Sequence, residues 1–206
     1  MHEELLKERV DPKQAALIVV DVQNDFVHPE GAIGKRALDT TMSMNMIPRL
    51  QKLIDGAHAA GVPVIFIRTE HGKWTNSKSW VIRKGNVAGP PICQVGTWGC
   101  EYYKVSPDVD DFVVIKHRYS AFQDTDLDLV LRSIGVESIL CTGVATNVCV
   151  ESTARQGYML DYNVVFVEDC CGTTTKEEHE ATLLNINLHF GIVATCDHVL
   201  KVWGVI

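Results

Sequence analysis

The chain has 206 residues, of which 46% are hydrophobic, and its formal net charge is −7. This length and apolar fraction suffice for one sizeable core, so we expect a single domain over residues 1–206. Nucleic acids and anionic membranes are excluded as main partners, because phosphates require a basic surface and no basic stripe occurs in the sequence.

The cysteine content and the first residues of the chain both favour a cytoplasmic protein. Seven cysteines are an odd number in a chain large enough to fold without disulfides, so we interpret them as reduced thiols. The chain begins Met1-His2-Glu3-Glu4, without a basic region followed by an apolar one, and no apolar run reaches membrane-spanning length.

The predicted elements alternate along the chain. A polar start predicts a short surface helix that ends before Pro12. Apolar, β-branched runs predict strands over residues 15–20, 62–68, 112–115, 138–141, 163–167 and 192–195. Helices are predicted over 45–60, from Thr125, from 146 to Gly157, from Thr175 and from Asp197, with capping boxes at Thr125/Asp128 and Thr175/Glu178. This order predicts an α/β fold, a three-layer α/β/α sandwich with a mostly parallel six-stranded sheet.

Residues 69–107 interrupt this alternation with a long segment of little periodicity. The segment contains Trp74, Trp80 and Trp98. Loops of this length in compact domains usually act as lids, binding loops or subunit contacts. The alternative is an arm that simply packs on the body of the protein or on a neighbouring subunit.

The segment 142–157 has the form of a nucleophile site, in which a strand is followed by a tight turn and a helix. With Thr146 or Asn147 as N-cap, Cys149 falls in the first helical turn, where the helix dipole favours a thiolate. Gly157 is expected to end this helix in a left-handed conformation. The alternative is that Cys149 is a buried structural cysteine.

Three chemically reactive residues share one kind of position. Asp21 and Lys116 follow the first and third predicted strands, and Cys149 opens the helix after the fourth. With a strand order of 2-1-3-4-5, these strands would be neighbours and the side chains would converge at the carboxyl edge of the sheet. An ammonium beside a thiol lowers its pKa, and a carboxylate can accept the thiol proton and pass it to a leaving amine. Taken one at a time, Asp21, Lys116 and Cys149 could each also have a purely structural role.

These residues lie in segments that resemble the three signature segments of the isochorismatase-like cysteine hydrolases. The segments are 21–26, the stretch around Lys116, and 143–150, and the resemblance extends over residues 15–196. The family includes nicotinamidases and the N-carbamoylsarcosine, biuret and ureidoacrylate amidohydrolases. The resemblance implies Cys149 as nucleophile, Asp21 as general acid and base, and Lys116 as the cation between them.

Further implications of the resemblance concern the backbone and the assembly. It implies a cis peptide between Val144 and Ala145, an oxyanion hole formed by the backbone N–H groups of Ala145 and Cys149, and a homo-oligomer, either dimer or tetramer. Nicotinamidases of the family hold a metal with an Asp-x-His pair, whereas the corresponding residues 68–73 lack that spacing. We therefore expect neither a catalytic metal nor another cofactor.

The resemblance also narrows the substrate to small ureido, carbamoyl or amide compounds. Residues 118–122 and 147–153 look like segments of the ureidoacrylate branch, and Cys170-Cys171 is similar to a feature of biuret hydrolases. Ureido groups need several hydrogen-bonding partners in a small pocket. The candidates are Asn24, Phe26, Tyr119, Phe122, Gln123, Thr146 and Asn147, any of which could instead stabilise its own loop or helix.

We therefore expect an enzyme, a cysteine amidohydrolase that cleaves a carbon–nitrogen bond through a covalent intermediate. Isochorismatases proper lack the cysteine, so Cys149 favours this chemistry over vinyl-ether hydrolysis. One alternative is a nicotinamidase. Another, from a different class, is a catalytically silent α/β protein in which Cys170 and Cys171 are the reactive thiols.

Overall fold

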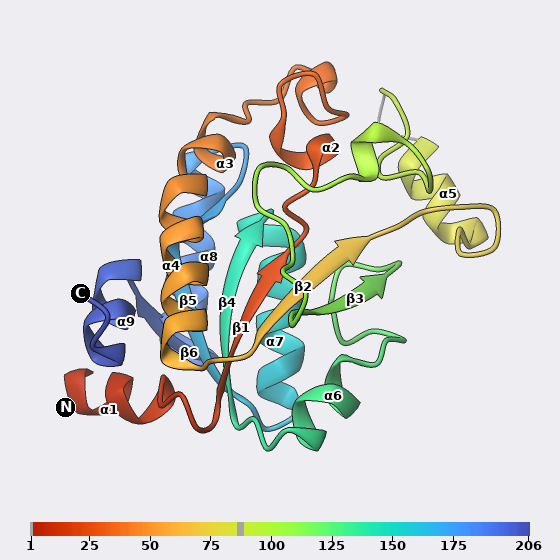
Figure 1. The fold of residues 1–206 in the computed structure, drawn as a ribbon. Helices are drawn as coiled ribbons and strands as arrows, with labels where there is room; N and C mark the ends of the chain where they lie inside the picture. Colours follow the sequence, from red (N-terminus) through yellow and green to blue (C-terminus); the bar gives the residue numbers. More distant parts are fainter. Residues whose placement is uncertain (1, 86–88) are drawn as a thin grey trace.

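The computed structural model describes residues 2–85 and 89–206, and the strands in these residues form one parallel sheet. The six strands lie in the order β3-β2-β1-β4-β5-β6 (Figure 1). Their bounds are β1 Ala15–Val20, β2 Val64–Thr69, β3 Phe112–Lys116, β4 Ser138–Val144, β5 Asn163–Gly172 and β6 Gly191–Ala194. All six strands were predicted; β5 extends further than expected, through Cys170 and Cys171.

Helices cover both faces of the sheet, which confirms the three-layer α/β/α sandwich (Figure 1). One face is covered by α1 (His2–Arg9), α4 (Ile47–Ala60) and α9 (Cys196–Trp203), and the other by α6 (Leu127–Ser133), α7 (Glu151–Met159) and α8 (Lys176–His189). The shorter helices α2 (Asn24–Val27), α3 (Thr41–Asn45) and α5 (Lys78–Gly85) lie in the connections. In Figure 1, α5 stands away from the sheet, beyond the end of β2.

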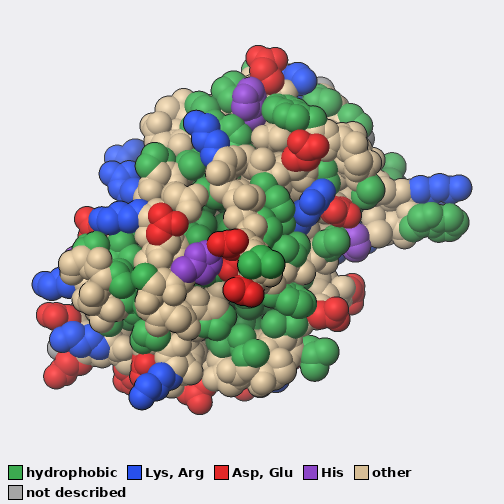
Figure 2. Space-filling view, viewed as in Figure 1, with side chains coloured by type: hydrophobic (Ala, Val, Ile, Leu, Met, Phe, Trp, Pro, Cys, Tyr) green, Lys and Arg blue, Asp and Glu red, His purple; other side chains and the backbone are tan. Residues whose placement is uncertain are grey.

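The central strand β1 is buried on both faces, as its continuous apolar run predicts. Leu17 and Val19 pack in the core beneath α4, whereas Ile18 and Val20 pack in the core beneath α7. Successive side chains of a strand point to opposite faces, so one apolar hexapeptide anchors both layers of helices. On the outer surface, Figure 2 shows Lys and Arg side chains separated by acidic and apolar ones over the face in view.

The expected strand order of 2-1-3-4-5 is wrong. Strand β3 pairs with β2 at the edge of the sheet, and β1 lies between β2 and β4. The alternation of strands and helices along the chain is compatible with both the expected and the observed strand order. The pattern indicates which residues are buried locally, but it does not indicate which strands pair. The long connection of residues 69–107 brings the chain back to the outer side of β2.

Gly157 does not end its helix, contrary to the sequence-based expectation. It lies within α7, and a Cβ at this position would come within 2.5 Å of Ile139 Cδ1 and 3.2 Å of Phe122 Cε2. The glycine therefore allows α7 to pack closely on β4. Its helix continues to Met159, with Leu160 as the C-cap residue.

Of the two predicted capping boxes, the one at Thr175 is half formed, since Glu178 Oε2 accepts from the Thr175 hydroxyl and not from its backbone N–H. The Thr175 hydroxyl accepts a hydrogen bond from the Glu178 N–H at the start of α8, as expected. At α6 the N-cap residue is Asp126, which makes no side-chain cap, and the Thr125 hydroxyl accepts a hydrogen bond from the Leu127 N–H instead. Thr125 therefore lies one residue too early for the capping box that its spacing to Asp128 suggested.

Gly143, just before the end of β4, allows that strand to approach β1. Its φ is +106°, and an added Cβ would come within 2.1 Å of the Val20 carbonyl oxygen. We predict that Gly143→Ala lowers the free energy of unfolding by more than about 2 kcal/mol, because backbone strain and a clash with backbone act together.

The matched control is Gly61→Ala, at the C-terminal end of α4. Gly61 also has a positive φ, +74°, but a Cβ there would meet nothing within 4 Å. Strain alone should lower the free energy of unfolding by about 1 kcal/mol. Urea unfolding of both variants checks this, and equal losses would contradict the clash at Gly143.

Candidate active site

The carboxyl ends of β3, β2 and β1 place three polar side chains in a row. Lys116 ends β3 and is the register partner of Thr69, which ends β2. Asp21 follows β1 directly, and its backbone N–H donates to the Ile67 carbonyl of β2. Because β2 lies between the other two strands, Thr69 occupies the position between Lys116 and Asp21.

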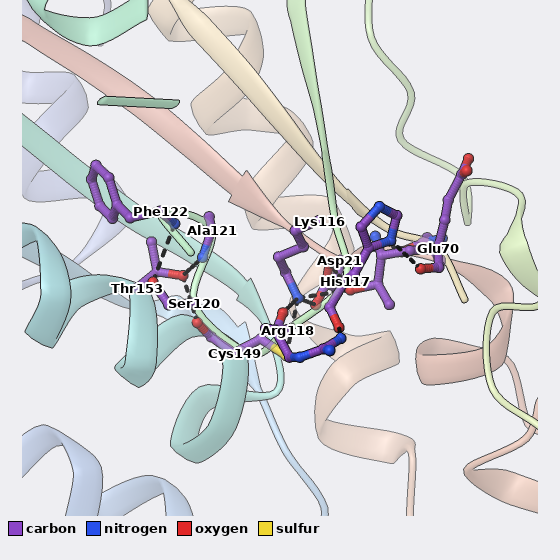
Figure 3. Close-up of polar contacts among 12 residues, drawn as sticks. Asp21, Glu70, Lys116, His117, Arg118, Ser120, Ala121, Phe122, Cys149 and Thr153 are labelled. Carbon is purple, nitrogen blue, oxygen red and sulfur yellow. Dashed lines mark hydrogen bonds and ion pairs between the residues drawn. The ribbon is translucent and has the colours of Figure 1, made fainter. Parts of the chain in front are cut away.

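The Lys116 ammonium is the centre of the site (Figure 3). Its Nζ lies 2.8 Å from Asp21 Oδ2, 2.7 Å from Thr69 Oγ1, 2.9 Å from the Arg118 carbonyl oxygen and 3.5 Å from Cys149 Sγ. Thr69 in turn donates its hydroxyl proton to Asp21 Oδ1 at 2.8 Å. The structure therefore brings together the acid, the cation and the thiol that the sequence singled out, although the strand order differs from the expected one.

Cys149 approaches this ion pair from the neighbouring strand β4. The Val144–Ala145 peptide bond after β4 is cis, as the resemblance implied. The chain then forms a π-helical turn, Thr146–Val150, which leads into α7. The Thr153 hydroxyl donates to the Cys149 carbonyl at 2.7 Å and accepts from the Ala121 N–H, so this turn is tied to the chain that follows β3.

Burial controls the protonation of the site. Burial lowers the pKa of Lys116, but the charge of Asp21 and the proximity of Cys149 outweigh it, so the pKa of Lys116 is raised above 10.5. For the Cys149 thiol, burial raises the pKa; Lys116 lowers it, Asp21 raises it, and the resulting pKa is about 12. Burial is the largest of these effects, so the pKa of Cys149 lies above the ordinary thiol value and not, as expected from the sequence, below it. Cys149 Sγ therefore lies 3.5 Å from an ammonium that is itself 2.8 Å from a carboxylate oxygen.

Two buried residues of the site were missed by the sequence analysis. Thr69 bridges the ion pair, and Gln23 holds the Thr69 backbone: Gln23 Oε1 accepts from the Thr69 N–H at 2.8 Å, and Gln23 Nε2 donates to the Thr69 carbonyl at 2.9 Å. Gln23 Nε2 also donates to the Cys100 carbonyl, at 2.8 Å. The available signal for Thr69 was its place after the apolar residues of the second strand, equivalent to the places of Asp21 and Lys116.

A cavity of about 340 Å³ opens over Cys149 and Lys116. Three of the predicted substrate-binding residues line it, namely Phe26, Tyr119 and Asn147, together with Ala145. The long segment 69–107 contributes a large part of the wall. Its lining residues are Thr69, His71, Trp80, Arg83 and Ile92.

The other four predicted substrate-binding residues lie outside the cavity lining. The Asn24 side chain donates to the Trp98 carbonyl, and the Thr146 hydroxyl hydrogen-bonds His179 Nδ1. Phe122 stacks on Tyr162 in the core, apart from Lys116 and Cys149 in Figure 3, and Gln123 lines a shallow surface hollow. Neither Thr146 nor Asn147 is an N-cap, because Ala145 precedes the π-helical turn and makes no side-chain cap.

Residues 2–85 and 89–206 contain neither a candidate metal site nor a candidate membrane span. No group of three or more His, Cys, Asp and Glu side chains in these ranges is arranged to hold a metal ion. Each helix of the described chain is too short or too polar to cross a bilayer. The expectation of metal-independent catalysis stays a prediction.

Comparison with known proteins places the chain in a family. The model of the isochorismatase domain matches residues 15–198, so the chain belongs to the isochorismatase family. It is 33% identical over 204 residues to a ureidoacrylate amidohydrolase RutB of Acinetobacter baylyi, covering 89% of this chain and 81% of the relative. A RutB of Methylobacterium radiotolerans is 35% identical over 202 residues, covering 90% and 78%. The crystal structure of a cysteine hydrolase from Pseudomonas syringae pv. phaseolicola superposes with a TM-score of 0.85 at 29% identity, covering 95% of each chain.

The buried ion pair generates a stability prediction. Asp21→Asn leaves the Lys116 ammonium buried without its counter-charge, so the free energy of unfolding should fall by about 3–5 kcal/mol at neutral pH. Burial then dominates and moves the pKa of Lys116 below 10.5. The unfolded chain would bind more protons than the folded one, so the variant should regain stability as pH rises from about 7 to about 8.5.

In the wild type Lys116 stays charged in both states over this range, so it contributes no such slope. The measurement is urea unfolding at several pH values, with Asp197→Asn as control, because Asp197 forms an exposed ion pair with Lys52. If Asp21→Asn lowered the free energy of unfolding no more than Asp197→Asn does, and if this loss did not depend on pH, the structural role of the Lys116–Asp21 ion pair would be contradicted.

Proposed function

We propose that this protein is a cysteine-dependent amidohydrolase that cleaves a carbon–nitrogen bond, other than a peptide bond, in a small ureido, carbamoyl or amide compound. The observation that carries the proposal is the buried contact of one ammonium with both a carboxylate and a thiol: Lys116 Nζ lies 2.8 Å from Asp21 Oδ2 and 3.5 Å from Cys149 Sγ. The two ureidoacrylate amidohydrolases and the cysteine hydrolase described above support it.

The first half of the reaction forms a thioester. Cys149 attacks the substrate carbonyl carbon while its thiol proton passes to the Asp21 carboxylate, and the carbonyl π electrons move to oxygen. The tetrahedral intermediate collapses, the carbon–nitrogen bond breaks, and Asp21 returns the proton to the departing ammonia or amine. Lys116 holds the Asp21 carboxylate beside the thiol through the 2.8 Å ion pair, and it stabilises negative charge that develops on sulfur.

The second half regenerates the enzyme. A water molecule loses a proton to Asp21 and attacks the thioester carbonyl, and the carbon–sulfur bond breaks. The acid leaves, and the proton held by Asp21 returns to the Cys149 sulfur. The overall balance is one water consumed for one carbon–nitrogen bond cleaved, and no redox partner takes part.

The backbone N–H groups of Ala145 and Cys149 are proposed as the oxyanion hole. Both residues line the cavity. Preorganised donors of this kind act where charge develops in the transition state, and loss of one typically reduces kcat by about 100-fold or more.

The cavity is suited to a small, flat and polar substrate. A volume of about 340 Å³ is near the lower end of ordinary ligand pockets. Asn147 Oδ1 accepts the Thr173 hydroxyl proton at 2.7 Å, which orients the two amide N–H donors of Asn147 for a substrate carbonyl. Phe26 and Tyr119 provide apolar surface beside them.

The alternative based on reactive Cys170 and Cys171 is not favoured by their surroundings. Both side chains are buried, and the pKa of each thiol is raised, for Cys170 by a hydrogen bond with Cys196 and by burial, and for Cys171 by burial. Cys149, by contrast, faces the cavity. The alternative that the protein is a nicotinamidase is tested by including nicotinamide among the substrates below.

The test is ammonia release from a panel of biuret, ureidoacrylate, N-carbamoyl amino acids, nicotinamide and simple amides. We expect the wild type to hydrolyse at least one ureido or carbamoyl compound, and Cys149→Ala to reduce its kcat by at least about 10⁴-fold, because the nucleophile is lost. Cys141→Ala is the matched control, since Cys141 is a buried cysteine of β4 outside the cavity.

Two outcomes would overturn the proposal. One is undiminished turnover by Cys149→Ala of a compound that the wild type hydrolyses. The other is turnover of nicotinamide alone, which would move the protein to the nicotinamidase branch.

We further propose a cytoplasmic homo-oligomer, a dimer or tetramer, in which the segment 69–107 closes the cavity and also contacts a second subunit. The seven cysteines are all unpaired, which supports a reducing compartment. The segment lines the cavity and also exposes large apolar side chains, with Trp74 91% exposed and Ile82 57% exposed. Phe112 and Ile115 of the edge strand β3 are exposed as well. Monomeric proteins rarely leave apolar side chains of this size together on the surface.

Sedimentation velocity at micromolar concentration checks the assembly. We expect a species of twice or four times the chain mass of 22.9 kDa. A single species of the chain mass itself, at all concentrations, would contradict this part of the proposal.

A further inference from the structure

The hydroxyl group of Thr69 lies between the two charged side chains of the site. Its oxygen accepts a hydrogen bond from Lys116 Nζ at 2.7 Å, and it donates its own proton to Asp21 Oδ1 at 2.8 Å. An ammonium can only donate, and a hydroxyl has a single proton. The contact with Lys116 therefore leaves the Thr69 proton for the carboxyl group, so the direction of the hydrogen bond to Asp21 is fixed.

The two oxygens of Asp21 are consequently not equivalent. Oδ1 accepts the proton of the Thr69 hydroxyl. Oδ2 is buried and lies 2.8 Å from Lys116 Nζ, but within the described chain no donor is aligned to form a hydrogen bond with it. The hydrogen bonds of the ammonium go to the Thr69 hydroxyl, the Arg118 carbonyl and Cys149 Sγ. Oδ2 is thus held by charge, and its lone pairs are free to take a proton.

The Cys149 thiol is near enough to Asp21 for the two groups to affect each other. Cys149 Sγ and Asp21 Oδ2 both contact the ammonium of Lys116, at 3.5 and 2.8 Å from Nζ. Burial raises the pKa of the thiol, and the nearby Asp21 raises it further. Because it shares the ammonium with the sulfur, Oδ2 is the Asp21 oxygen that is placed to receive the thiol proton.

The backbone of Thr69 holds its hydroxyl in this place. Gln23, which is fully buried, accepts from the Thr69 N–H at 2.8 Å and donates to the Thr69 carbonyl at 2.9 Å. The Gln23 amide nitrogen also donates to the Cys100 carbonyl, so turning the amide around would lose all three hydrogen bonds. Thr69 is therefore fixed through both of its backbone polar groups, and little further entropy is lost when its hydroxyl is ordered.

The backbone of Asp21 is constrained as well. Its φ is +53°, in the left-handed region, which costs a residue with a side chain roughly 1–2 kcal/mol. Residues in such conformations gather at functional sites, where the surrounding structure must maintain them. The Asp21 carbonyl accepts from the Gln23 N–H at 2.7 Å. Gln23 thus contacts the backbones of both Asp21 and Thr69, and it fixes the carboxyl group and the hydroxyl relative to each other.

We propose that Thr69 is a positioning residue of the hydrolysis, whose hydroxyl engages Asp21 Oδ1 and thereby leaves Oδ2 as the oxygen that carries the proton. This proposal rests on the proposed function, because it assigns the atoms of the proton transfer described there. A proton on Oδ1 would weaken the hydrogen bond that Thr69 donates to it, since an ionised acceptor forms a stronger hydrogen bond than a neutral one. Oδ2 has no such hydrogen bond to lose.

The proton then has one defined course. When Cys149 attacks, the S–H bond breaks, the electron pair left on sulfur forms the carbon–sulfur bond, the carbonyl π electrons move to oxygen, and the proton binds Asp21 Oδ2. When the carbon–nitrogen bond breaks, the same proton passes from Oδ2 to the leaving nitrogen. Thr69 keeps its own proton throughout, so it acts only through Asp21.

The first measurement is ammonia release from a compound of the panel that the wild type hydrolyses through Cys149. Thr69→Val keeps the shape of the side chain and removes the hydroxyl. It should lower kcat about 10- to 100-fold and leave KM nearly unchanged, because proton transfer is impaired and substrate binding is not. Thr69→Ser keeps the hydroxyl and should retain most of the activity.

The second measurement needs no substrate. It is the rate at which iodoacetamide alkylates Cys149 at neutral pH, followed for this cysteine by peptide mass spectrometry. Because the thiolate is the reacting form, loss of a well-placed proton acceptor in Thr69→Val should slow alkylation about 10-fold, whereas Thr69→Ser should not. A variant with a loosened site would expose the buried Cys149 and be alkylated faster, so a merely structural effect has the opposite sign.

The control variant is Thr182→Val. Thr182 is also buried, and its hydroxyl also donates to a carboxylate, Glu151 Oε2 at 2.7 Å, but it lies on α8 outside the cavity lining. This substitution should change neither kcat nor the alkylation of Cys149. Thermal unfolding of each variant identifies a folding defect, and Thr69→Ala, compared with Thr69→Ser, carries the test if Thr69→Val does not fold.

The outcomes separate the two proposals. The role of Thr69 is wrong if Thr69→Val keeps the kcat and the alkylation rate of the wild type, if Thr69→Ser is as slow as Thr69→Val, or if Thr182→Val is as slow. In each case the amidohydrolase function stands, provided that hydrolysis depends on Cys149. If no compound of the panel is hydrolysed through Cys149, the proposed function fails, and the alkylation rates still decide whether Thr69 controls the Cys149 proton.

Discussion

The ammonium of Lys116 is 1% exposed, and the structure around it is arranged to satisfy that buried charge. A lone charge of this kind would be expelled or would lose its proton, so its position depends on a partner of opposite sign. Asp21, fully buried, provides the partner, and Thr69 and the Arg118 carbonyl accept the remaining protons. Because these groups come from the ends of three strands and the loop after β3, the ion pair holds the carboxyl edge of the sheet in one arrangement.

Burial and this same ion pair together set the direction of the Cys149 pKa. A cation beside Cys149 would stabilise a thiolate, but Asp21 offsets that cation, and burial raises the pKa of the thiol. In the proposed mechanism, attack on the substrate is coupled to proton transfer from Cys149 to Asp21, so the proton moves within a buried group of three residues. As a consequence, neither Asp21 nor Lys116 can be replaced alone without leaving a buried charge unmatched.

The sheet and the loops contribute different parts of the site. Strand ends and the π-helical turn position Asp21, Lys116 and Cys149, which perform the proposed chemistry. The connections after β1 and β2 provide about half of the residues that line the wall, including Arg36 and residues of segment 69–107. Loops tolerate change better than buried strands do, so the same buried machinery can serve different substrates through different walls.

Local sequence determined the strands, most helices and the three reactive residues, because apolar periodicity and strand ends depend on the burial of neighbouring residues. Three features were missed for one reason, which is that each depends on which distant segments pack together. They are the strand order, the Thr69 hydroxyl that bridges Lys116 and Asp21, and the position of Gly157 inside α7 and not at its end. The same holds for Asn147, which faces the cavity while its neighbour Thr146 turns to His179. The direction of the Cys149 pKa was also decided by tertiary structure, because burial and counter-charges set the energy of an ionisable group, and both come from residues far apart in the chain.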